Sequence, residues 1–254
     1  KLLIRPAPEV AIKSKPVRRQ QMRHLRQNIR KLLARLDPEI RVEGSWDRVD
    51  VEVPDGRGLS GPALELLLRI PGISTIQEIG AFPFVSLEDV AEKAVEAFAD
   101  RLNGKTFAVR ARRHGEHSFR SIDLERTVGA ALMHASGASG VDLKSPQVEV
   151  RIEVQDDQFH IAHRKHRGLG GYPLGSVENV LTLISGGYDS SVAAYLMMRR
   201  GLRNHFLFFN LGGTAHEVGV RQVVHYLWDR YGASHSAKFI SVPFEGVVAE
   251  IMRS

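Results

Sequence analysis

The chain has 254 residues, of which 43% are apolar, carries a formal charge of +6 and contains no cysteine. Without cysteine, disulfides and cysteine-ligated metal sites are excluded, and the histidines show no HExxH spacing, so we expect no zinc site. No apolar run approaches a membrane span or a signal peptide, which predicts a cytoplasmic protein with no membrane contact.

The positive charge is concentrated at one end of the chain. Residues 1–60 hold 14 Lys and Arg against 8 Asp and Glu, whereas the remainder is close to neutral. Such an asymmetry suggests a polyanionic partner, and nucleic acid is the leading candidate. A solvated basic helix face is the alternative, and charge alone does not separate the two.

The first elements are a strand over residues 2–5, extended chain again near Val10 and Ile12, and a long helix from Pro16 to about Leu36. The helix is predicted from an apolar stripe at helical spacing. The stripe consists of Met22, Leu25, Ile29, Leu32 and Leu36.

Four arginines, Arg19, Arg23, Arg26 and Arg30, follow the same helix at i, i+4, i+7 and i+11. This spacing places the guanidinium groups on one narrow face of the helix. Like charges four residues apart repel by a few tenths of a kcal/mol per pair. The column therefore suits contact with phosphates better than contact with water.

The next elements complete a β-α-β-β-α-β order, which is typical of a ferredoxin-like unit of about 75 residues. They are strands over residues 41–43 and 49–53, a turn at 55–58, a helix over 62–68 and a strand near 76–79.

A second α+β unit begins near Ala81. Its predicted elements are a helix over residues 87–102, a strand over 106–112, a helix over 121–135 with Ser121 as its N-cap, and strands over 148–154 and 159–163. Basic residues on and after the strands are candidate contacts to the phosphate backbone of a nucleic acid. They are Arg110, Arg112, Arg113, Lys165 and Arg167.

From Val180 onwards, short apolar strands alternate with helices, which predicts a parallel α/β sheet. The strands are expected over residues 180–184, 205–209 and 239–242. The helices are expected over 189–200 and 216–231, with a third beginning at Glu245.

Between the first strand and helix of this region lies Ser185-Gly186-Gly187-Tyr188-Asp189-Ser190. Glycines let the backbone approach an anion, a helix N-terminus attracts negative charge, and serine hydroxyls donate to phosphate oxygens. Asp189 fits beside a phosphate if it holds a Mg²⁺ that bridges the two. The alternative is a tight turn with Asp189 as a helix cap. The segment is not a Walker A loop, because it lacks GxxxxGK[ST].

The hexapeptide resembles the SGGxDS signature of the PP-loop ATP pyrophosphatases. Further segments are similar to the tRNA 4-thiouridine synthetase family, and the resemblance covers essentially the whole chain. It implies a ferredoxin-like domain over residues 1–78, a THUMP RNA-binding domain over 79–167, a linker over 168–176 and an incomplete PP-loop domain over 177–254. The segments are Ile12-Lys13-Ser14, VRARRHGEHSFRSIDLE from Val109, the Gly168–Gly175 stretch, FNLGG from Phe209, and Ala215-His216-Glu217.

This resemblance implies that ATP and Mg²⁺ activate O4 of tRNA uridine-8 as an adenylate, with Asp189 as the catalytic and Mg²⁺-holding residue, and that a persulfide sulfur then displaces AMP. It also implies a role in thiamine thiazole synthesis, a cysteine desulfurase as sulfur donor, a possible homodimer, and sulfur-relay cysteines beyond residue 254. Lys13 joins the four helix arginines as an expected tRNA contact. The expected nucleotide-binding residues are Leu183, Ile184, Ser185, Gly186, Gly187, Asp189, Ser190, Phe208 and Phe209.

Two other functions stay open on the sequence. One is a THUMP-type RNA-binding module with a vestigial nucleotide site, and the other is a PP-loop adenylating enzyme with a different acceptor. The basic N-terminal helix argues against the latter, because a small-molecule ligase has no use for it.

Overall fold

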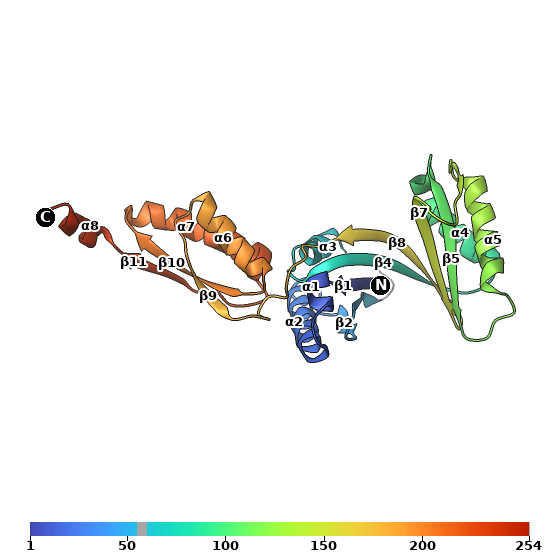
Figure 1. Cartoon of the computed structure of the whole chain (residues 1–254), viewed down its shortest axis with the longest axis horizontal. Coiled ribbons are helices and arrows are strands. Elements are labelled where there is room, and N and C mark those ends of the chain that lie inside the picture. Colours follow the sequence, from blue (N-terminus) through green and yellow to red (C-terminus); the bar gives the residue numbers. More distant parts are fainter. Residues whose placement is uncertain (55–59, 254) are drawn as a thin grey trace. The chain divides into compact units, whose positions relative to one another are not determined.

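A computed structural model describes residues 1–54 and 60–253 of the chain (Figure 1). The turn predicted at residues 55–58 lies outside this part. The chain divides into two units: the first contains Lys1–Leu2 and Gln77–Lys165, and the second contains Leu3–Ile76 and His166–Ser254. No described helix is long and apolar enough to cross a membrane.

The N-terminal part of the second unit has the predicted ferredoxin-like order, with sheet order β2-β3-β1-β4. Helix α2 buries Met22, Leu25 and Ile29. The elements from the N-terminus to the end of this sheet are β1 (Leu2–Pro6), α1 (Pro8–Ala11), α2 (Lys15–Leu33), β2 (Arg41–Gly44), β3 (Val49–Glu52), α3 (Gly61–Leu68) and β4 (Ile73–Pro83).

Two sequence predictions fail here. The chain near Val10 is the short helix α1, which has a proline in its first turn, and Ile12 is 81% exposed and has no strand position. Helix α2 ends at Leu33, so Leu36 lies beyond it and is exposed. The amide of Asp37 still bonds the Leu33 carbonyl, and Pro38 then disfavours further helix.

The first unit contains the described THUMP-like segment, with strand order β8-β7-β5-β6. Strand β5 is parallel to both β6 and β7, and β7 is antiparallel to β8. Helices α4 and α5 share one core with these strands, built around Phe98, Phe107 and Phe159. The elements after β4 are α4 (Leu87–Leu102), β5 (Thr106–His114), α5 (Ser121–Ala135), β6 (Gly140–Val141), β7 (Val148–Gln155) and β8 (Gln158–Arg167).

The bounds of α4 and α5 are those predicted, but the N-cap of α5 is Arg120 and not Ser121. The Asp123 carboxylate accepts the Arg120 backbone N–H at 2.9 Å. The Arg120 side chain and this backbone N–H lower the pKa of Asp123. Strand β8 also runs four residues further than predicted, so Lys165 and Arg167 lie on a strand.

The C-terminal part of the second unit is a parallel sheet of order β11-β10-β9, as predicted. Helices α6 and α7 lie on one face of it (Figure 1). On the other face Leu181, Leu183 and Ile240 are exposed. The elements are β9 (Asn179–Leu183), α6 (Tyr188–Arg199), β10 (Arg203–Asn210), α7 (Gly213–Leu227), the π-helical turn η2 (Trp228–Gly232), β11 (Phe239–Pro243) and α8 (Glu245–Ile251).

The glycine-rich linker, residues 168–176, is held by backbone hydrogen bonds at both ends. Gly170 exchanges bonds with the turn before β4, donating to Ile73 and accepting from Gly72. Further along, Tyr172 donates to the Arg199 carbonyl at 2.9 Å and Gly175 donates to that of Gly201 at 2.8 Å. The linker is therefore fixed to the C-terminal end of α6.

Candidate functional site

The Ser185–Ser190 loop connects the end of β9 to the start of α6. Gly186 has a φ of +82°, in the left-handed region, and a Cβ at this position would lie 3.0 Å from Cγ2 of Val220 on α7. A side chain here is thus opposed both by the backbone conformation and by the packing of α7. The glycine permits the sharp turn that brings the loop to the first turn of α6.

Serine hydroxyls hold the loop in shape. The Ser185 backbone N–H donates to Ser190 Oγ at 3.2 Å, and the hydroxyls of the two serines lie 3.1 Å apart. Ser190 and Ser191 also donate to the Gly187 carbonyl, at 3.2 and 2.8 Å. No side chain among the described residues caps α6. The N–H groups of its first turn are therefore available to an anion at this helix N-terminus.

Asp189 is exposed in the first turn of α6. Within the described part of the chain, no group of three His, Asp or Glu side chains could hold a metal by itself. Mg²⁺ is commonly held by one or two carboxylates together with substrate phosphates and water. An exposed carboxylate beside an uncapped helix N-terminus fits that ligand set, with Asp189 as the protein's contribution.

The apolar residues expected beside the nucleotide fall into two groups. Leu183 and Phe209, at the ends of β9 and β10, are 60% and 41% exposed, so their side chains are accessible. Ile184 and Phe208 are buried, and the Phe208 ring packs edge-on against His216 at 5.0 Å. Ile184 and Phe208 can reach a ligand only through their backbone groups.

Two features of this site were not predicted from the sequence. Tyr188 is 92% exposed in the loop, so its ring is accessible to a ligand. In the sequence, Tyr188 stands only as the variable residue x of the SGGxDS signature. Glu217, on α7, accepts hydrogen bonds from Asn210 at the end of β10 and from Ser241 of β11. In the sequence, the one sign of Glu217 was its place in residues 215–217, a segment that resembles the tRNA 4-thiouridine synthetase family.

The four arginines on α2 do not act alike. Arg26 donates to the Gly44 carbonyl at 2.8 Å and Arg30 to the Val42 carbonyl at 2.7 Å, so both bind the edge strand β2. Arg19 and Arg23 are exposed. The column therefore combines two arginines that stabilise the fold with two whose charge faces solvent.

The remaining basic candidates are exposed or partly so. Lys13 lies over the ring of Tyr172, 5.5 Å from its centroid. In the first unit, Arg110 pairs with Glu149 at 3.5 Å and Arg113 donates to the His117 carbonyl at 3.0 Å. The exposed residues Arg112, Lys165 and Arg167 complete the set.

Replacing both Arg19 and Arg23 by glutamine tests the nucleic-acid contact that the sequence predicts for α2, and we expect this contact to weaken in its electrostatic part. The slope of log affinity against log salt should fall by about 1.4 to 1.8, because each phosphate contact contributes about 0.7 to 0.9. The midpoint of thermal unfolding should stay unchanged. Salt titrations of tRNA affinity measure the slope.

The matched variant replaces Arg26 and Arg30, whose hydrogen bonds to β2 should make its loss of stability the larger one. A wild-type salt slope in the Arg19/Arg23 variant would mean that these two residues are only a solvated face.

Three family models match successive parts of the chain. They are the ThiI ferredoxin-like domain over residues 1–76, the THUMP domain over 84–164, and "Thiamine biosynthesis protein (ThiI)" over 175–254. Among relatives, the tRNA sulfurtransferase of Marinobacter nauticus is 82% identical over 100% of this chain and 52% of its own length. That of Pseudomonas aeruginosa strain UCBPP-PA14 is 52% identical over 99% of this chain and 52% of its own length.

Solved structures show the same fold. A 4-thiouridine synthetase, crystallised in complex with RNA and with bound ATP, has a TM-score of 0.75 at 22% identity, over 98% of this chain and 64% of that one. A Pyrococcus horikoshii protein has a TM-score of 0.73 at 23% identity, over 99% of this chain and 81% of that one. The three domain models follow one another in the expected order, the identity to the listed tRNA sulfurtransferases extends along the whole chain, and the chain spans about half the length of these relatives.

Proposed function

We propose that this chain provides the tRNA-binding and ATP-binding part of a tRNA sulfurtransferase that converts uridine-8 of tRNA to 4-thiouridine. The observation that carries the proposal is the Ser185–Ser190 loop: a glycine turn, two paired serines and an uncapped helix N-terminus at the end of a parallel strand. The same chain contains a THUMP domain, which supplies the reason for an RNA acceptor.

In this proposal the loop binds the pyrophosphate end of ATP. The first-turn N–H groups of α6 and the Ser185 hydroxyl donate to phosphate oxygens, and the Ser190 hydroxyl would leave the Gly187 carbonyl to do the same. Asp189 would hold Mg²⁺, which neutralises charge on the phosphates when it is bound. Leu183 and Phe209 border the nucleotide with their side chains, and Ile184 and Phe208 with their backbone.

The proposed reaction has two stages. O4 of the uridine attacks the α-phosphorus of ATP, the bond to the β-phosphate breaks, and pyrophosphate leaves from the loop. The terminal sulfur of a persulfide then attacks C4 and AMP leaves. A second thiol attacks the remaining S–S bond, which releases 4-thiouridine and leaves a disulfide that an external dithiol reduces. Because the 254 residues contain no cysteine, the thiol that carries the sulfur must lie outside them. The proposal also includes a cysteine desulfurase as the sulfur donor and delivery of sulfur to thiamine thiazole synthesis. It further includes a cytoplasmic location and a homodimer.

Binding of tRNA is assigned to the basic residues of both units. On α2 the exposed pair Arg19 and Arg23 would contact backbone phosphates, while Arg26 and Arg30 combine any such contact with their bonds to β2. Lys13 and the basic residues of β5 and β8 extend the set. These residues are Arg110, Arg112, Arg113, Lys165 and Arg167.

Calorimetry and a pyrophosphate assay test the proposal. We expect the chain to bind MgATP and tRNA, and to release pyrophosphate only with tRNA that carries uridine at position 8. The control is the same tRNA with cytidine there. If tRNA binds without any ATP binding, the chain is an RNA-binding module. If pyrophosphate is released equally without tRNA, the acceptor is a different molecule.

A further inference from the structure

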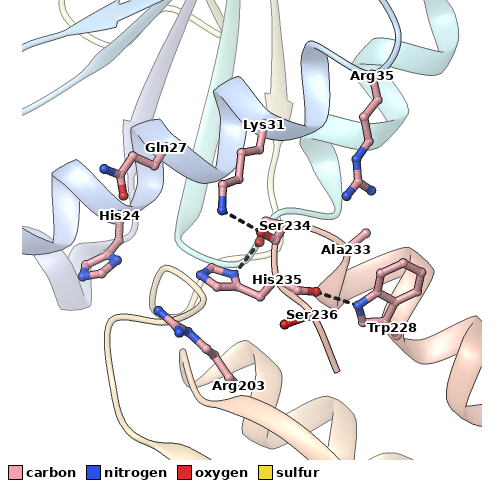
Figure 2. A pocket seen from close by; sticks show the side chains of 10 residues that line it. All are labelled: His24, Gln27, Lys31, Arg35, Arg203, Trp228, Ala233, Ser234, His235 and Ser236. Carbon is pink, nitrogen blue, oxygen red and sulfur yellow. Dashed lines mark hydrogen bonds between the residues drawn. The ribbon is translucent and has the colours of Figure 1, made fainter. Parts of the chain in front are cut away.

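A second candidate site lies in the second unit, in a pocket of about 650 Å³ between α2 and the loop that follows η2 (Figure 2). Its lining is strongly basic and contains no carboxylate. The lining residues are His24, Gln27, Lys31 and Arg35 of α2, Arg203 of β10, Trp228 of η2, and Ala233, Ser234, His235 and Ser236.

Hydrogen bonds fix the loop at the pocket wall. Lys31 Nζ donates to the Ser234 carbonyl at 3.4 Å, and Ser234 Oγ lies 3.0 Å from Nδ1 of His235. The Trp228 indole N–H donates to the His235 carbonyl at 2.7 Å. Figure 2 shows Lys31 and Arg35 reaching down from α2 towards this loop. The ammonium of Lys31 has three donors, and the Ser234 bond uses one of them.

Arg203 carries an unsatisfied donor at this pocket. Its Nε is buried and has no hydrogen-bond partner among the described residues. It lies close to His235 beside Gly175, since a Cβ on Gly175 would be 2.8 Å from Arg203 Nε and 2.7 Å from His235 Nε2. A buried donor without an acceptor costs free energy. The guanidinium of Arg203 lines the pocket and provides a positive charge that an anion there could pair with.

The two histidines of the pocket, His24 and His235, have lowered pKa values because they are partly buried among cations. Burial, followed by Arg203 and Lys31, lowers the pKa of His235 to about 4. Burial, followed by Arg203 and Arg23, lowers the pKa of His24. Both imidazoles are therefore neutral at pH 7 in the empty pocket. A bound anion would offset the field of Lys31, Arg35 and Arg203 and raise both pKa values.

We propose that this pocket binds a phosphate group, supplied either as inorganic phosphate or as a phosphodiester of RNA. Lysine and arginine side chains are the usual protein donors to such groups, and the cavity has room for the substituents of a diester. This site is separate from the Ser185–Ser190 loop, so it stands or falls independently of the proposed thiolation.

The test titrates the whole chain with sodium sulfate and with sodium phosphate while the His24 and His235 ring signals are followed by NMR. Sulfate stays dianionic, so any pH dependence of its binding belongs to the protein. We expect saturable shifts of both signals, and tighter sulfate binding at about pH 5 than at about pH 8, because the bound anion favours protonated histidine and the effect grows as the pH falls towards the free-state pKa of His235. Sodium chloride at equal ionic strength is the reference.

Three variants locate the site: Lys31→Gln, Arg35→Gln and Arg203→Gln. Each should weaken sulfate binding about tenfold through the loss of one charged hydrogen bond. Arg200→Gln, an exposed arginine at the end of α6, should leave it unchanged. Lys31 and Arg35 are also exposed, so their variants keep the test decisive even if Arg203→Gln fails to fold.

A short single-stranded RNA separates the two sources of phosphate. If RNA supplies the phosphate, it shifts the same histidine signals, and sulfate competes with it. If the source is free phosphate, RNA leaves these signals in place while sulfate and phosphate move them. The proposal is overturned if sulfate and phosphate shift the signals no more than chloride does, or if the shifts persist at full affinity in the Lys31 and Arg35 variants.

Discussion

Replacing Asp189 by asparagine is expected to weaken MgATP binding by about 100-fold, from the loss of a few kcal/mol of metal-mediated charge stabilisation. The amide keeps the size of the side chain but cannot provide a charged ligand to Mg²⁺. The diagnostic result is the loss of metal dependence: the variant should bind ATP equally well with Mg²⁺ and with a chelator. Isothermal titration calorimetry under both conditions measures this.

Asp229→Asn is the matched control for this prediction, because Asp229 is an exposed acid on η2 and its replacement changes the net charge by the same amount. It should bind MgATP like the unchanged chain. If ATP binding by the Asp189→Asn variant keeps its full Mg²⁺ dependence, Asp189 belongs to the first turn of α6 without binding the metal.

The second large effect is expected from Gly171→Ala in the glycine-rich linker. Gly171 has a φ of +78°, and a Cβ there would lie 2.1 Å from the Arg199 carbonyl oxygen. The unfavourable backbone conformation and the clash together should lower the free energy of unfolding of the second unit by about 3 kcal/mol. Both tryptophans, Trp46 and Trp228, belong to this unit, so denaturation followed by tryptophan fluorescence reports on it.

Gly213→Ala separates the two contributions. Gly213 has a similar φ of +68°, but the nearest atom to a Cβ added there would be Glu245 Oε1, at 3.7 Å. This variant should lose only the conformational part, about 1 kcal/mol. Equal losses in the two variants would show that the Arg199 backbone moves aside easily and that the close approach of linker and helix is not needed.

The sequence predicted elements well where periodicity was strong. The apolar stripe through Val90, Ala94 and Phe98 predicted α4, and the Ser185–Ser190 segment lies between a strand and a helix as predicted. Short elements were missed: α1 has only one buried residue, Val10, so its four residues show no helical periodicity.

Side-chain partners formed across long sequence separations could not be predicted. The carbonyl acceptors of Arg26 and Arg30 lie on β2, and their pairing depends on how α2 packs against that edge strand. In the same way, His24, Arg203 and His235 lie on three distant segments, and no spacing in the sequence relates them. Such clusters are a product of tertiary packing.

The bonds between the linker and α6 have a consequence for the thermodynamics of the unit. Helix α6 has 12 residues, about 18 Å of length, with the Ser185–Ser190 loop at one end and the amides of Tyr172 and Gly175 bonded at the other. A ligand that stabilises the first turn of this helix also suppresses the local openings that release those two amides. Slower hydrogen exchange at Tyr172 and Gly175 is thus a remote reporter of occupancy at a loop that neither residue touches.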